Sequence, residues 1–331
     1  MKDVLIVIPC LNEEAHLAAL LINLLADSGA ATIVVADGRS TDNSRLIVEE
    51  LAAIHPRLHL LDNPARLQSA GVNLAVRCFG EGMRWLVRVD AHCGYPPQYA
   101  ASLVRAAVAQ GATSVVVPMI TKGEGCFQRA AAAAQNSVLG NGGSSHRRLT
   151  TGRFIDHGHH ALFDLALFSA VGGYDESFSH NEDAELDLRL MAAGGRIWLE
   201  PSLALTYWPR RAPGPLFRQY KGYGSGRART LARHGTRMKL RQAAPLAVAP
   251  ALALAAVGLL LVPLAPLALL LTLPALSWAG LCLGFGLLLG LRERSACVAG
   301  AGWAAIVMHS AWSFGFWRAR LTGPPPERPP R

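Results

Sequence analysis

Asp90 and His92 stand two residues apart, where a predicted strand at residues 85–89 gives way to glycine and proline. Two side chains at this spacing can reach one ion once the strand has ended in a loop. A carboxylate with an imidazole suits Mn²⁺ better than Mg²⁺, which prefers ligand shells made of oxygen. A divalent ion held there would act as a Lewis acid toward phosphate oxygens. Asp90 and His92 are therefore candidate metal ligands, and a hydrogen-bonded loop residue is the alternative for His92.

A second acidic pair, Glu182 and Asp183, opens a predicted amphipathic helix whose apolar residues include Leu186 and Leu190. Both carboxylates lie near the helix N-terminus, where the helix dipole favours the ionised form. A positioned carboxylate can accept the proton that an attacking hydroxyl loses. Asp183 is therefore the first candidate for a general base and Glu182 the second. Capping of the helix by Asn181 and the two acids is the alternative.

Polar residues also follow the first two predicted strands. Asn12 and Glu13 come after the first strand, and Asp37 comes directly after the second. In parallel sheets, ligands bind outside the carboxyl ends of the strands. These side chains are therefore expected beside a bound small molecule, although Asp37 could instead begin a turn.

A histidine cluster follows later in the chain at His157, His159 and His160. The H-x-H-H spacing could indicate zinc, but no cysteine or further histidine stands at the spacing of a known zinc module. Contact of these side chains with a sugar or a phosphate is the preferred interpretation.

Strands and helices alternate through the first 120 residues. Strands are predicted at 4–9, 32–36, 58–61, 85–89 and 114–118, and helices at 13–26, 42–54, 69–77 and 98–110. This order predicts an α/β fold with a mostly parallel sheet covered by helices on both faces. An Ala-, Gly- and Ser-rich segment at 123–153 is expected to be a mobile loop that contains a helix. It could be a lid over the site or a plain surface insertion.

The net charge of +9 comes from one segment of the chain. Residues 201–242 contain ten bases and no acid, so the remainder carries about 9 − 10 = −1. These bases are Arg210, Arg211, Arg218, Lys221, Arg227, Arg229, Arg233, Arg237, Lys239 and Arg241. The belt adjoins a long apolar stretch, which argues against nucleic-acid binding. It fits the positive-inside rule and attraction to anionic lipid or phosphate.

Three apolar stretches follow, at 243–262, 266–291 and 296–317, and each is about as long as the ~20 residues that a membrane helix needs. From Ala243 to Trp317 the only charged residues are Arg292, Glu293 and Arg294, between the second and third stretches. Three membrane helices are therefore expected, and a soluble helical domain is the disfavoured alternative. The N-terminus does not resemble a signal peptide, so the catalytic part is expected in the cytoplasm.

The domain organisation predicted from these patterns is a catalytic domain at 1–200, a basic juxtamembrane element at 201–242, three transmembrane helices at 243–318 and a Pro/Arg-rich tail at 319–331. Three crossings would place the C-terminal bases on the opposite side from the basic belt, against the charge rule. These bases are Arg318, Arg320, Arg328 and Arg331. The six cysteines show no CxxC spacing, and reduced structural thiols are expected.

Five motifs occur in an order that resembles the family 2 glycosyltransferases, which are inverting enzymes of the GT-A fold. They are PCLNEE at 9–14, DGRSTD at 37–42, VDAH at 89–92, GGYDE at 172–176 and NEDAELDLR at 181–189. The match covers about residues 1–208. VDAHCGYPPQY, DHGHHALF, SHNEDAELD and RQYKGYGSGRART further resemble the membrane-bound glucosyltransferases of bacterial succinoglycan (exopolysaccharide) synthesis. The Asp90-x-His92 pair departs from the Asp-x-Asp metal motif of the family.

The resemblance implies transfer of a hexose with inversion, with glucose from UDP-glucose as the first candidate, onto a polyprenyl-diphosphate-linked saccharide. A transferase that adds the sugar directly to a polyprenyl phosphate is the alternative. The implied cofactor is a divalent metal ion, Mn²⁺ or Mg²⁺. Nucleotide or phosphate contacts are implied for Pro9, Asn12, Glu13, Asp37, Arg66, Asp90, Gln219, Arg227 and Arg229. The implied partners are a nucleotide-sugar, a lipid-linked saccharide, membrane lipids of the bacterial inner membrane and other exopolysaccharide assembly enzymes.

Two other classes of protein are less consistent with the sequence. A dinucleotide-dependent oxidoreductase shares the parallel sheet, but Pro-Cys-Leu-Asn follows the first strand in place of G-x-G-x-x-G. A non-catalytic membrane scaffold would not need Asp37, Asp90 and Asp183 together.

Overall fold

A computed structural model describes residues 1–142 and 151–323, which fall into two compact units. Unit 1 comprises Met1–Ile120 and Arg148–Tyr207, and unit 2 comprises Thr121–Arg147 and Trp208–Arg331. The centre of the predicted mobile loop and the end of the Pro/Arg-rich tail lie outside the described residues. The segment after residue 120 belongs to the same unit as the C-terminal helices, which sequence patterns did not indicate.

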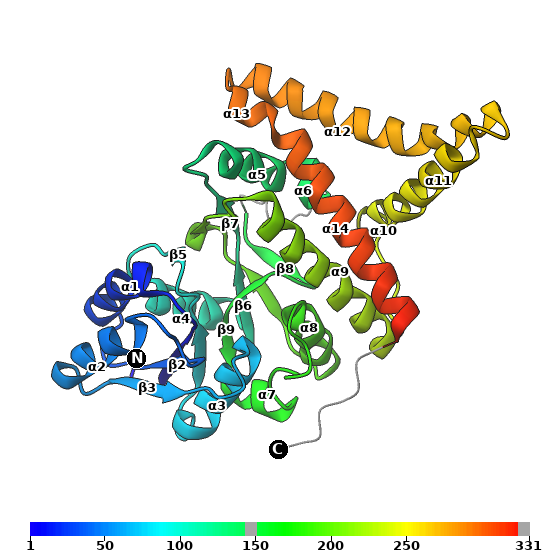
Figure 1. Ribbon diagram of the computed structural model, residues 1–331. Helices are drawn as coiled ribbons and strands as arrows, with labels where there is room; N and C mark the ends of the chain where they lie inside the picture. The colour runs from blue at the N-terminus through cyan, green and yellow to red at the C-terminus, as the bar shows by residue number, and fades with distance from the viewer. Residues whose placement is uncertain (143–150, 324–331) are drawn as a thin grey trace. The chain divides into compact units, whose positions relative to one another are not determined.

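Unit 1 is built on an eight-stranded mixed sheet with the order β3-β2-β1-β4-β9-β6-β10-β8 (Figure 1). The strands are β1 (Val4–Cys10), β2 (Thr32–Asp37), β3 (Leu58–Asp62), β4 (Trp85–Arg88), β6 (Ser114–Val117), β8 (Arg153–Ile155), β9 (His159–Asp164) and β10 (Ile197–Leu199). Strands β1 to β4 are parallel, and β10 is parallel to β6. Strand β9 runs antiparallel to both of its neighbours, β4 and β6.

The predicted alternation of strands and helices is confirmed. The helices of unit 1 are α1 (Glu14–Asp27), α2 (Ser44–Ile54), α3 (Gln68–Phe79), α4 (Tyr99–Gln110), α7 (Leu165–Ala170) and α8 (Glu182–Ala192), with a 3-10 turn at Pro201–Leu203. Strand β9 was not predicted and separates β6 from β4, so the sheet is less uniformly parallel than the first 120 residues alone indicate.

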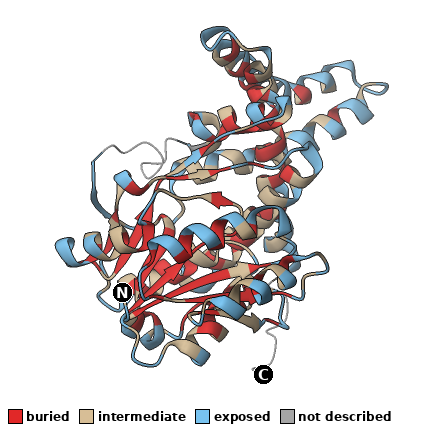
Figure 2. Ribbon diagram, turned by 90° about the vertical axis from the view of Figure 1, so that its left-hand side faces the viewer, coloured by how far each residue is buried: buried red, intermediate tan, exposed pale blue. Residues whose placement is uncertain are grey.

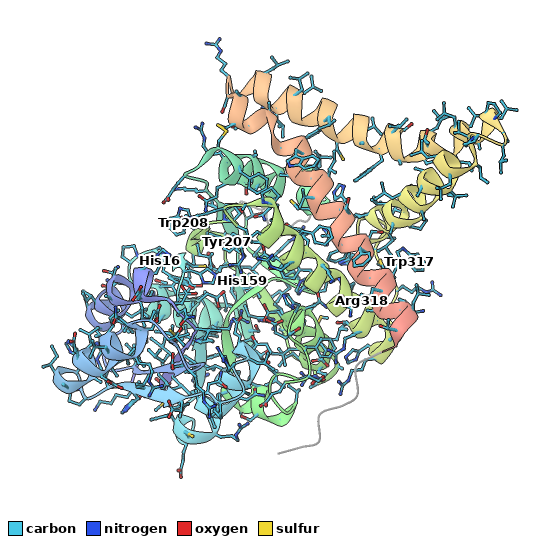
Figure 3. All side chains as sticks on the ribbon, in the orientation of Figure 1. His16, His159, Tyr207, Trp208, Trp317 and Arg318 are labelled. Atoms are coloured by element: carbon cyan, nitrogen blue, oxygen red, sulfur yellow. A yellow bond between two sulfur atoms is a disulfide. The ribbon has the colours of Figure 1, made fainter. Side chains whose placement is uncertain are left out.

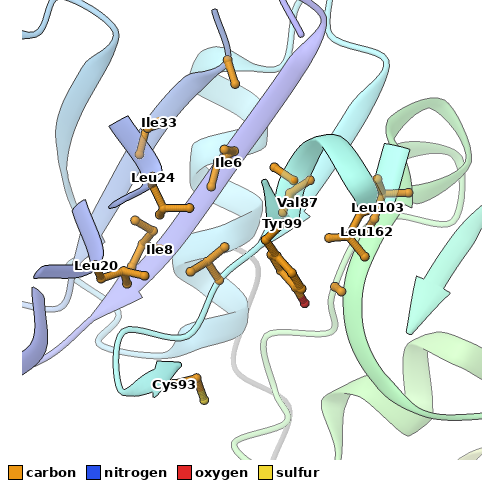
Figure 4. Packing of buried hydrophobic residues seen from close by; sticks show 14 of the residues in the cluster. Ile6, Ile8, Leu20, Leu24, Ile33, Val87, Cys93, Tyr99, Leu103 and Leu162 are labelled. Atoms are coloured by element: carbon orange, nitrogen blue, oxygen red, sulfur yellow. The ribbon is translucent and has the colours of Figure 1, made fainter. Parts of the chain in front are cut away.

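The central strands are apolar on both faces because each face is covered (Figure 2). Side chains alternate along β1, so Val4, Ile6 and Ile8 join one buried cluster while Leu5 and Val7 join another. The first cluster includes five leucines of α1, and Figure 4 shows part of its packing. The second cluster includes residues of α3, α7 and α8. This two-sided burial fixes where the carboxyl ends of β1, β2 and β4 lie.

A small three-stranded sheet, β5-β11-β7, accompanies the large one. Its strands are β5 (Cys93–Gly94), β11 (Leu205–Tyr207) and β7 (Met119–Thr121). Cys93 pairs with Tyr207 in the antiparallel β5 and β11 ladder. The residues directly after His92 therefore form a short strand, where the sequence predicted only a loop.

Unit 2 is helical over its described residues. Its helices are α5 (Cys126–Asn136), α6 (Val138–Asn141), α9 (Pro213–His234), α10 (Leu240–Ala243), α11 (Val248–Leu261), α12 (Leu273–Arg292), α13 (Ala296–Ala299) and α14 (Ala301–Thr322), with 3-10 segments η3 (Ala244–Ala247) and η4 (Pro266–Thr272). Three helical segments, Leu240–Leu261, Pro266–Arg292 and Ala296–Thr322, are long and apolar enough to cross a membrane. They coincide with the three apolar stretches of the sequence.

The expectation of reduced cysteines is wrong for one pair. Cys126 at the start of α5 and Cys297 in α13 form a disulfide, 171 residues apart in the sequence. The other four cysteines, Cys10, Cys78, Cys93 and Cys282, are free. Sequence spacing could not indicate the bond because it depends on how distant helices pack within unit 2.

The glycine pair before Tyr174 makes a tight turn against α3. Gly172 and Gly173 have φ values of 85° and 67°, a region that glycine adopts without a steric penalty. Asn73 of α3 holds the turn, because its Nδ2 donates to the Tyr174 carbonyl at 2.8 Å and its Oδ1 accepts from the Tyr174 backbone N–H at 2.9 Å. The side chain of Tyr174 is thereby fixed in the buried interior.

We expect Gly173→Ala to destabilise unit 1 much more than Gly172→Ala. Both substitutions force alanine into a left-handed conformation, at about 1–2 kcal/mol each. A Cβ on Gly173 would also lie 2.5 Å from Asn73 Oδ1, whereas a Cβ on Gly172 meets nothing within 4 Å. The overlap should add about 1–3 kcal/mol at position 173. Thermal unfolding of the two purified variants measures the difference, and equal midpoints would contradict the role of the turn.

Candidate active site

Asp90 follows the end of β4, where several polar side chains converge. Its Oδ1 accepts from Gln68 Nε2 at 3.0 Å, and its backbone N–H donates to Tyr95 Oη at 2.7 Å. Asp90 Oδ2 lies 3.6 Å from His159 Nε2, at the start of β9 (Figure 3). Burial would raise the pKa of Asp90, but the adjacent Arg88 cation and two histidines outweigh it and lower that pKa. Asp90 is therefore held as an anion.

Arg88 is the buried cation of this region and was not singled out from the sequence. Only 5% of the residue is exposed, although it carries a full charge. Its Nε lies 3.3 Å from Asp90 Oδ1, and its Nη1 donates to Asp183 Oδ1 at 2.6 Å. Nη1 also donates to Tyr174 Oη at 2.9 Å. One guanidinium therefore connects the carboxylate after β4 with the first turn of α8.

Asp183 is oriented by two donors on the same oxygen. Arg88 and the Tyr174 hydroxyl, at 2.9 Å, both donate to Oδ1. Within the part of the chain that the structure describes, no protein donor contacts Oδ2. Burial would raise the pKa of Asp183, but the Arg88 cation outweighs burial and holds it well below its usual range. The side chain is thus an ionised carboxylate with one oxygen available to a ligand.

Glu182 differs sharply from its neighbour in protonation. Burial, followed by the negative charge of Asp183, raises the pKa of Glu182 to about 7. Asn181, the residue before this helix, has a φ of 67° and makes no side-chain capping hydrogen bond. Simple capping by Asn181 therefore does not account for the motif. Two adjacent acids with separated pKa values are typical of acid and base roles in catalysis.

His92 pairs with Glu13 rather than with Asp90. His92 Nδ1 lies 2.9 Å from Glu13 Oε1, which brings together the residues that follow β1 and β4. Asn12 is exposed in a left-handed conformation, and its Oδ1 accepts from the Thr41 backbone N–H at 2.8 Å. Asn12 thus ties the segment after β1 to the turn after β2, while Pro9 lies half-buried within β1.

Asp37 is buried at the end of β2 and already has strong partners. Its Oδ2 accepts from Arg45 Nη1 at 2.9 Å, and its Oδ1 accepts from Ser40 Oγ at 2.5 Å. These contacts organise the turn into α2, so a nucleotide contact by Asp37 stays a prediction. Arg66 is exposed. Its backbone lies close to the residue after Asp37, because a Cβ on Gly38 would lie 3.5 Å from Arg66 Cα. Its guanidinium has no hydrogen bond or ion pair among the described residues.

The histidine cluster is divided between two sites. His159 faces Asp90, whereas His157 and His160 flank Asp187 of α8. Asp187 Oδ2 lies 2.6 Å from His157 Nδ1, and its Oδ1 lies 2.6 Å from His160 Nε2. Burial opposes the protonation of His160, but Asp187 raises its pKa overall. Because Asp187 is one helical turn after Asp183, this pairing anchors the same face of α8 to β9.

Three predicted site residues belong to unit 2. Gln219, Arg227 and Arg229 lie on α9, and each is half-buried. Gln219 Nε2 donates to Tyr223 Oη at 3.0 Å. Arg218 is exposed on the same helix. These residues make α9 a basic helix, which could bind phosphate groups.

The side chains around Asp90 provide some, but not all, of the ligands that a metal ion needs. Among the described residues, no three His, Cys, Asp or Glu side chains are grouped as a ready-made metal site. Asp90 Oδ2 and His159 Nε2, at 3.6 Å, are nevertheless close enough to share one ion. His92 would first have to leave Glu13. A ligand's phosphate oxygens and water would have to supply the remaining positions, as is usual for ions bound with a phosphorylated ligand.

Comparison with known proteins defines the class of this protein. A model described as glycosyl transferase family 2 matches residues 5–172. The chain belongs to the family 2 glycosyltransferases, so it is a sugar-transferring enzyme, as the motif order predicts. The GT-A fold is also confirmed. A mannosyltransferase from Pyrobaculum calidifontis, solved with GDP-mannose and Mn²⁺, superimposes with a TM-score of 0.57 at 18% identity, covering 94% of this chain and 86% of that one.

The sequence similarity extends to one particular type within the family. The chain is 51% identical over 319 residues to succinoglycan biosynthesis protein ExoA of Rhizobium meliloti (strain 1021). The alignment covers 96% of this chain and 94% of that protein. The succinoglycan type predicted from the finer motifs is therefore confirmed.

We expect Arg88→Met to be strongly destabilising. The substitution leaves Asp90 and Asp183 without their shared cation, which for a buried ion pair costs about 3–5 kcal/mol. With Arg88 present, the lowered pKa values of both carboxyls contribute stability at neutral pH that is lost in acid. In the variant those pKa values should rise, so the deficit in unfolding free energy should be larger at pH 8 than at pH 5.

Arg77→Met provides the matched control. Arg77 is 61% exposed and lies 3.6 Å from Glu176, which is 42% exposed. Such a surface pair contributes at most about 1 kcal/mol. Chemical unfolding of both variants across this pH range tests the comparison, and a deficit for Arg88→Met that is independent of pH would contradict it.

Proposed function

We propose that this enzyme transfers a hexose with inversion, with glucose from UDP-glucose as the first candidate donor, to a polyprenyl-diphosphate-linked saccharide in bacterial exopolysaccharide synthesis. The observation that carries the proposal is the Arg88 bridge between Asp90 and Asp183. It holds a donor-side carboxylate and a candidate base beside each other in unit 1. The 51% identity to a succinoglycan biosynthesis protein supports the pathway.

The nucleotide half of the donor would lie over the carboxyl ends of β1 and β2. Asn12, Glu13 and Asp37 would supply acceptors for base or ribose groups there, and Pro9 lies directly before Cys10, where β1 ends. Arg66 offers an exposed guanidinium that could bind the diphosphate in a bidentate manner. The contacts that Asp37 makes with Arg45 and Ser40 keep its carboxylate fixed while a ligand approaches.

The diphosphate would leave beside Asp90. A divalent ion bound there would stabilise the developing negative charge of the leaving diphosphate as a Lewis acid. Asp90 and His159 would hold such an ion, and His92 would be a further ligand once it left Glu13. Arg88 keeps Asp90 ionised, which is the form that a metal ligand requires.

Asp183 would act as the general base. An acceptor hydroxyl must lose a proton as it attacks the anomeric carbon, and Asp183 Oδ2 has no protein donor among the described residues. Arg88 and Tyr174 fix the orientation of the carboxylate through Oδ1. Because direct displacement places the attacking hydroxyl opposite the leaving group, the anomeric carbon would lie between the diphosphate beside Asp90 and the acceptor hydroxyl at Asp183 Oδ2.

The acceptor would be bound by unit 2. Gln219, Arg227 and Arg229 on α9 supply amide and guanidinium groups for a lipid diphosphate. The apolar helices of the same unit would accommodate the polyprenyl chain within the bacterial inner membrane, with the catalytic domain on the cytoplasmic side. Other exopolysaccharide assembly enzymes would then be neighbours in the pathway.

A screen of nucleotide-sugars tests the donor. Thermal stabilisation of the purified protein is measured with each nucleotide-sugar, with and without Mn²⁺, and UDP-glucose is expected to give the largest Mn²⁺-dependent shift. Product analysis with two acceptors then tests the second half of the proposal. Transfer to polyprenyl phosphate in place of a lipid-linked saccharide would support the direct lipid-phosphate transferase instead.

Asp183→Asn should lower turnover by roughly 10²–10⁴, the usual contribution of a general base. The amide keeps the size of the side chain but cannot accept a proton. Donor affinity should barely change, because the residue need not contact the nucleotide. Steady-state kinetics and calorimetric titration with the donor separate these effects. Near-normal turnover, or a loss of donor binding in proportion to activity, would transfer the role to Glu182 or Asp175.

The pH dependence of turnover distinguishes Asp183 from Glu182. Since the pKa of Asp183 is held well below its usual range, a base at this position is ionised at any pH near neutrality. Glu182 would have to lose a proton with a pKa of about 7, so turnover would rise with pH through that value. We expect native enzyme and Glu182→Gln to have profiles of the same shape. If turnover of the native enzyme rises with pH near 7 and this rise is absent in Glu182→Gln, the base is Glu182.

Asp90→Ala should abolish turnover and weaken Mn²⁺ binding by at least about tenfold, whereas His92→Asp should keep activity and shift the preference from Mn²⁺ toward Mg²⁺. Mn²⁺ affinity is measured by electron paramagnetic resonance in the presence of UDP, independently of activity. His159→Ala in the same assay shows whether this histidine is a ligand. Full activity in excess chelator would exclude the metal.

A further inference from the structure

The last of the three apolar helices, α14, differs from the other two in its surroundings. Half of its candidate span is buried within the protein, compared with 11% and 17% for the spans that contain α11 and α12. A helix in contact with lipid exposes apolar side chains around much of its surface, as α11 and α12 do. Helix α14 instead has protein on several sides.

One of those sides is the basic helix α9. A Cβ on Gly224 of α9 would lie 2.1 Å from the Trp312 carbonyl oxygen, and a Cβ on Gly315 of α14 would lie 2.1 Å from the Lys221 carbonyl oxygen. Ser225 Oγ donates to the Gly315 carbonyl at 2.9 Å. The two backbones are therefore in direct contact.

The charge on α9 limits where such a pair can lie. The helix carries Arg218, Lys221, Arg227, Arg229 and Arg233 and no acid. Charged side chains in the bilayer centre are costly, and this helix has several. A helix packed along α9 therefore cannot cross the hydrocarbon core without drawing these bases into it.

A second side of α14 faces the short helices α5 and α6. His309, near the middle of α14, lies 2.7 Å through Nε2 from the Leu139 carbonyl oxygen of α6. Ala131 and Ala134 of α5 pack with Ala301 and Ala304. Gln128 of α5 donates to the Pro209 carbonyl at 2.8 Å. Short helices and irregular backbone of this kind are not stable against lipid.

The preceding helices form a hairpin with the opposite character. No charged residue occurs between Arg241 and Arg292, and large apolar side chains are exposed along the hairpin. Examples are Leu260 at 77%, Leu264 at 84% and Leu281 at 75% exposure. A Cβ on Gly258 of α11 would lie 2.6 Å from the Ala268 carbonyl oxygen, so the chain turns back tightly through η4.

Aromatic and basic residues mark the ends of α14. Trp303 and Trp317 are exposed, and Trp317 Nε1 donates to the Leu246 carbonyl, just before α11 begins, at 2.8 Å. Arg318 is exposed in the next position, and Arg320 follows (Figure 3). Tryptophan is enriched where membrane meets water, and arginine on the cytoplasmic side.

We infer that the α11–α12 hairpin alone enters the bilayer, while α9 and α14 lie together at the anionic lipid surface. Both ends of the hairpin and the C-terminal end of α14 are then on one side of the membrane. This arrangement replaces the three crossings expected from the sequence and removes their conflict with the charge rule. Arg292, Arg294, Arg318 and Arg320 all lie on the same side as the bases of α9.

Reporter fusions to the full chain test the location of the C-terminus. A fluorescent protein that folds only in the cytoplasm, fused after the last residue, should fluoresce as brightly per molecule as the same protein fused to the N-terminus. Alkaline phosphatase at the C-terminus, which is active only outside the cytoplasm, should be inactive. An active phosphatase with a dark fluorescent fusion would establish the third crossing and overturn the inference.

Two matched aspartate substitutions give an independent measurement. Phe314 of α14 and Leu281 of α12 are exposed by 48% and 75%, and each lies well inside its candidate span. Leu281→Asp places a charge in lipid and should lower the yield of membrane-integrated protein by about tenfold or more. Phe314→Asp should keep the native yield within about twofold, because Lys221 Nζ already lies 5.4 Å from the Phe314 ring. Equal losses would overturn the inference.

Discussion

Burial of the Arg88 guanidinium is the constraint on which the candidate site depends. A cation removed from water must be paired and hydrogen-bonded, or its desolvation is not compensated. Asp90, Asp183 and Tyr174 provide that compensation from different parts of unit 1. The strand β4, the glycine turn and the start of α8 can therefore form their final structure only together. Geometry of this kind is already set before a substrate arrives, which lowers the reorganisation that catalysis would otherwise require.

The same cation also separates the behaviour of two adjacent acids. Asp183 contacts Arg88 directly and stays ionised, whereas burial and the charge of Asp183 leave Glu182 with a pKa near neutrality. A sequence shows two equivalent carboxylates at 182 and 183. Their environments give one of them a fixed charge and the other a proton that it can lose in the physiological range. This difference arises from tertiary structure and not from the motif itself.

Local patterns in the sequence predicted the local parts of the structure well. Buried apolar runs and amphipathic periodicity placed β1 to β4, β6 and α1 to α4 within about two residues, because these signals reflect burial of the element itself. The short strands β5 and β7 were not predicted. Strand β9 was missed because it begins with two histidines and ends in an aspartate, which leaves only a short apolar run between them. The motif order indicated the family correctly. The Cys126–Cys297 bond and the pairing of His92 with Glu13 join residues far apart in the chain, and no local signal reports such contacts.

Arg88 was missed for a related reason, since a charged residue within a buried strand looks like an interruption of the pattern. Polar residues that break a buried run can mark the site that the run supports. Strand β9 has a further consequence. Because it runs opposite to β4, the beginning of β9, and not its end, lies beside Asp90. The chain between the end of β8 at Ile155 and the start of β9 therefore delivers His159 to Asp90, and a change in its length would move that histidine away from the carboxylate.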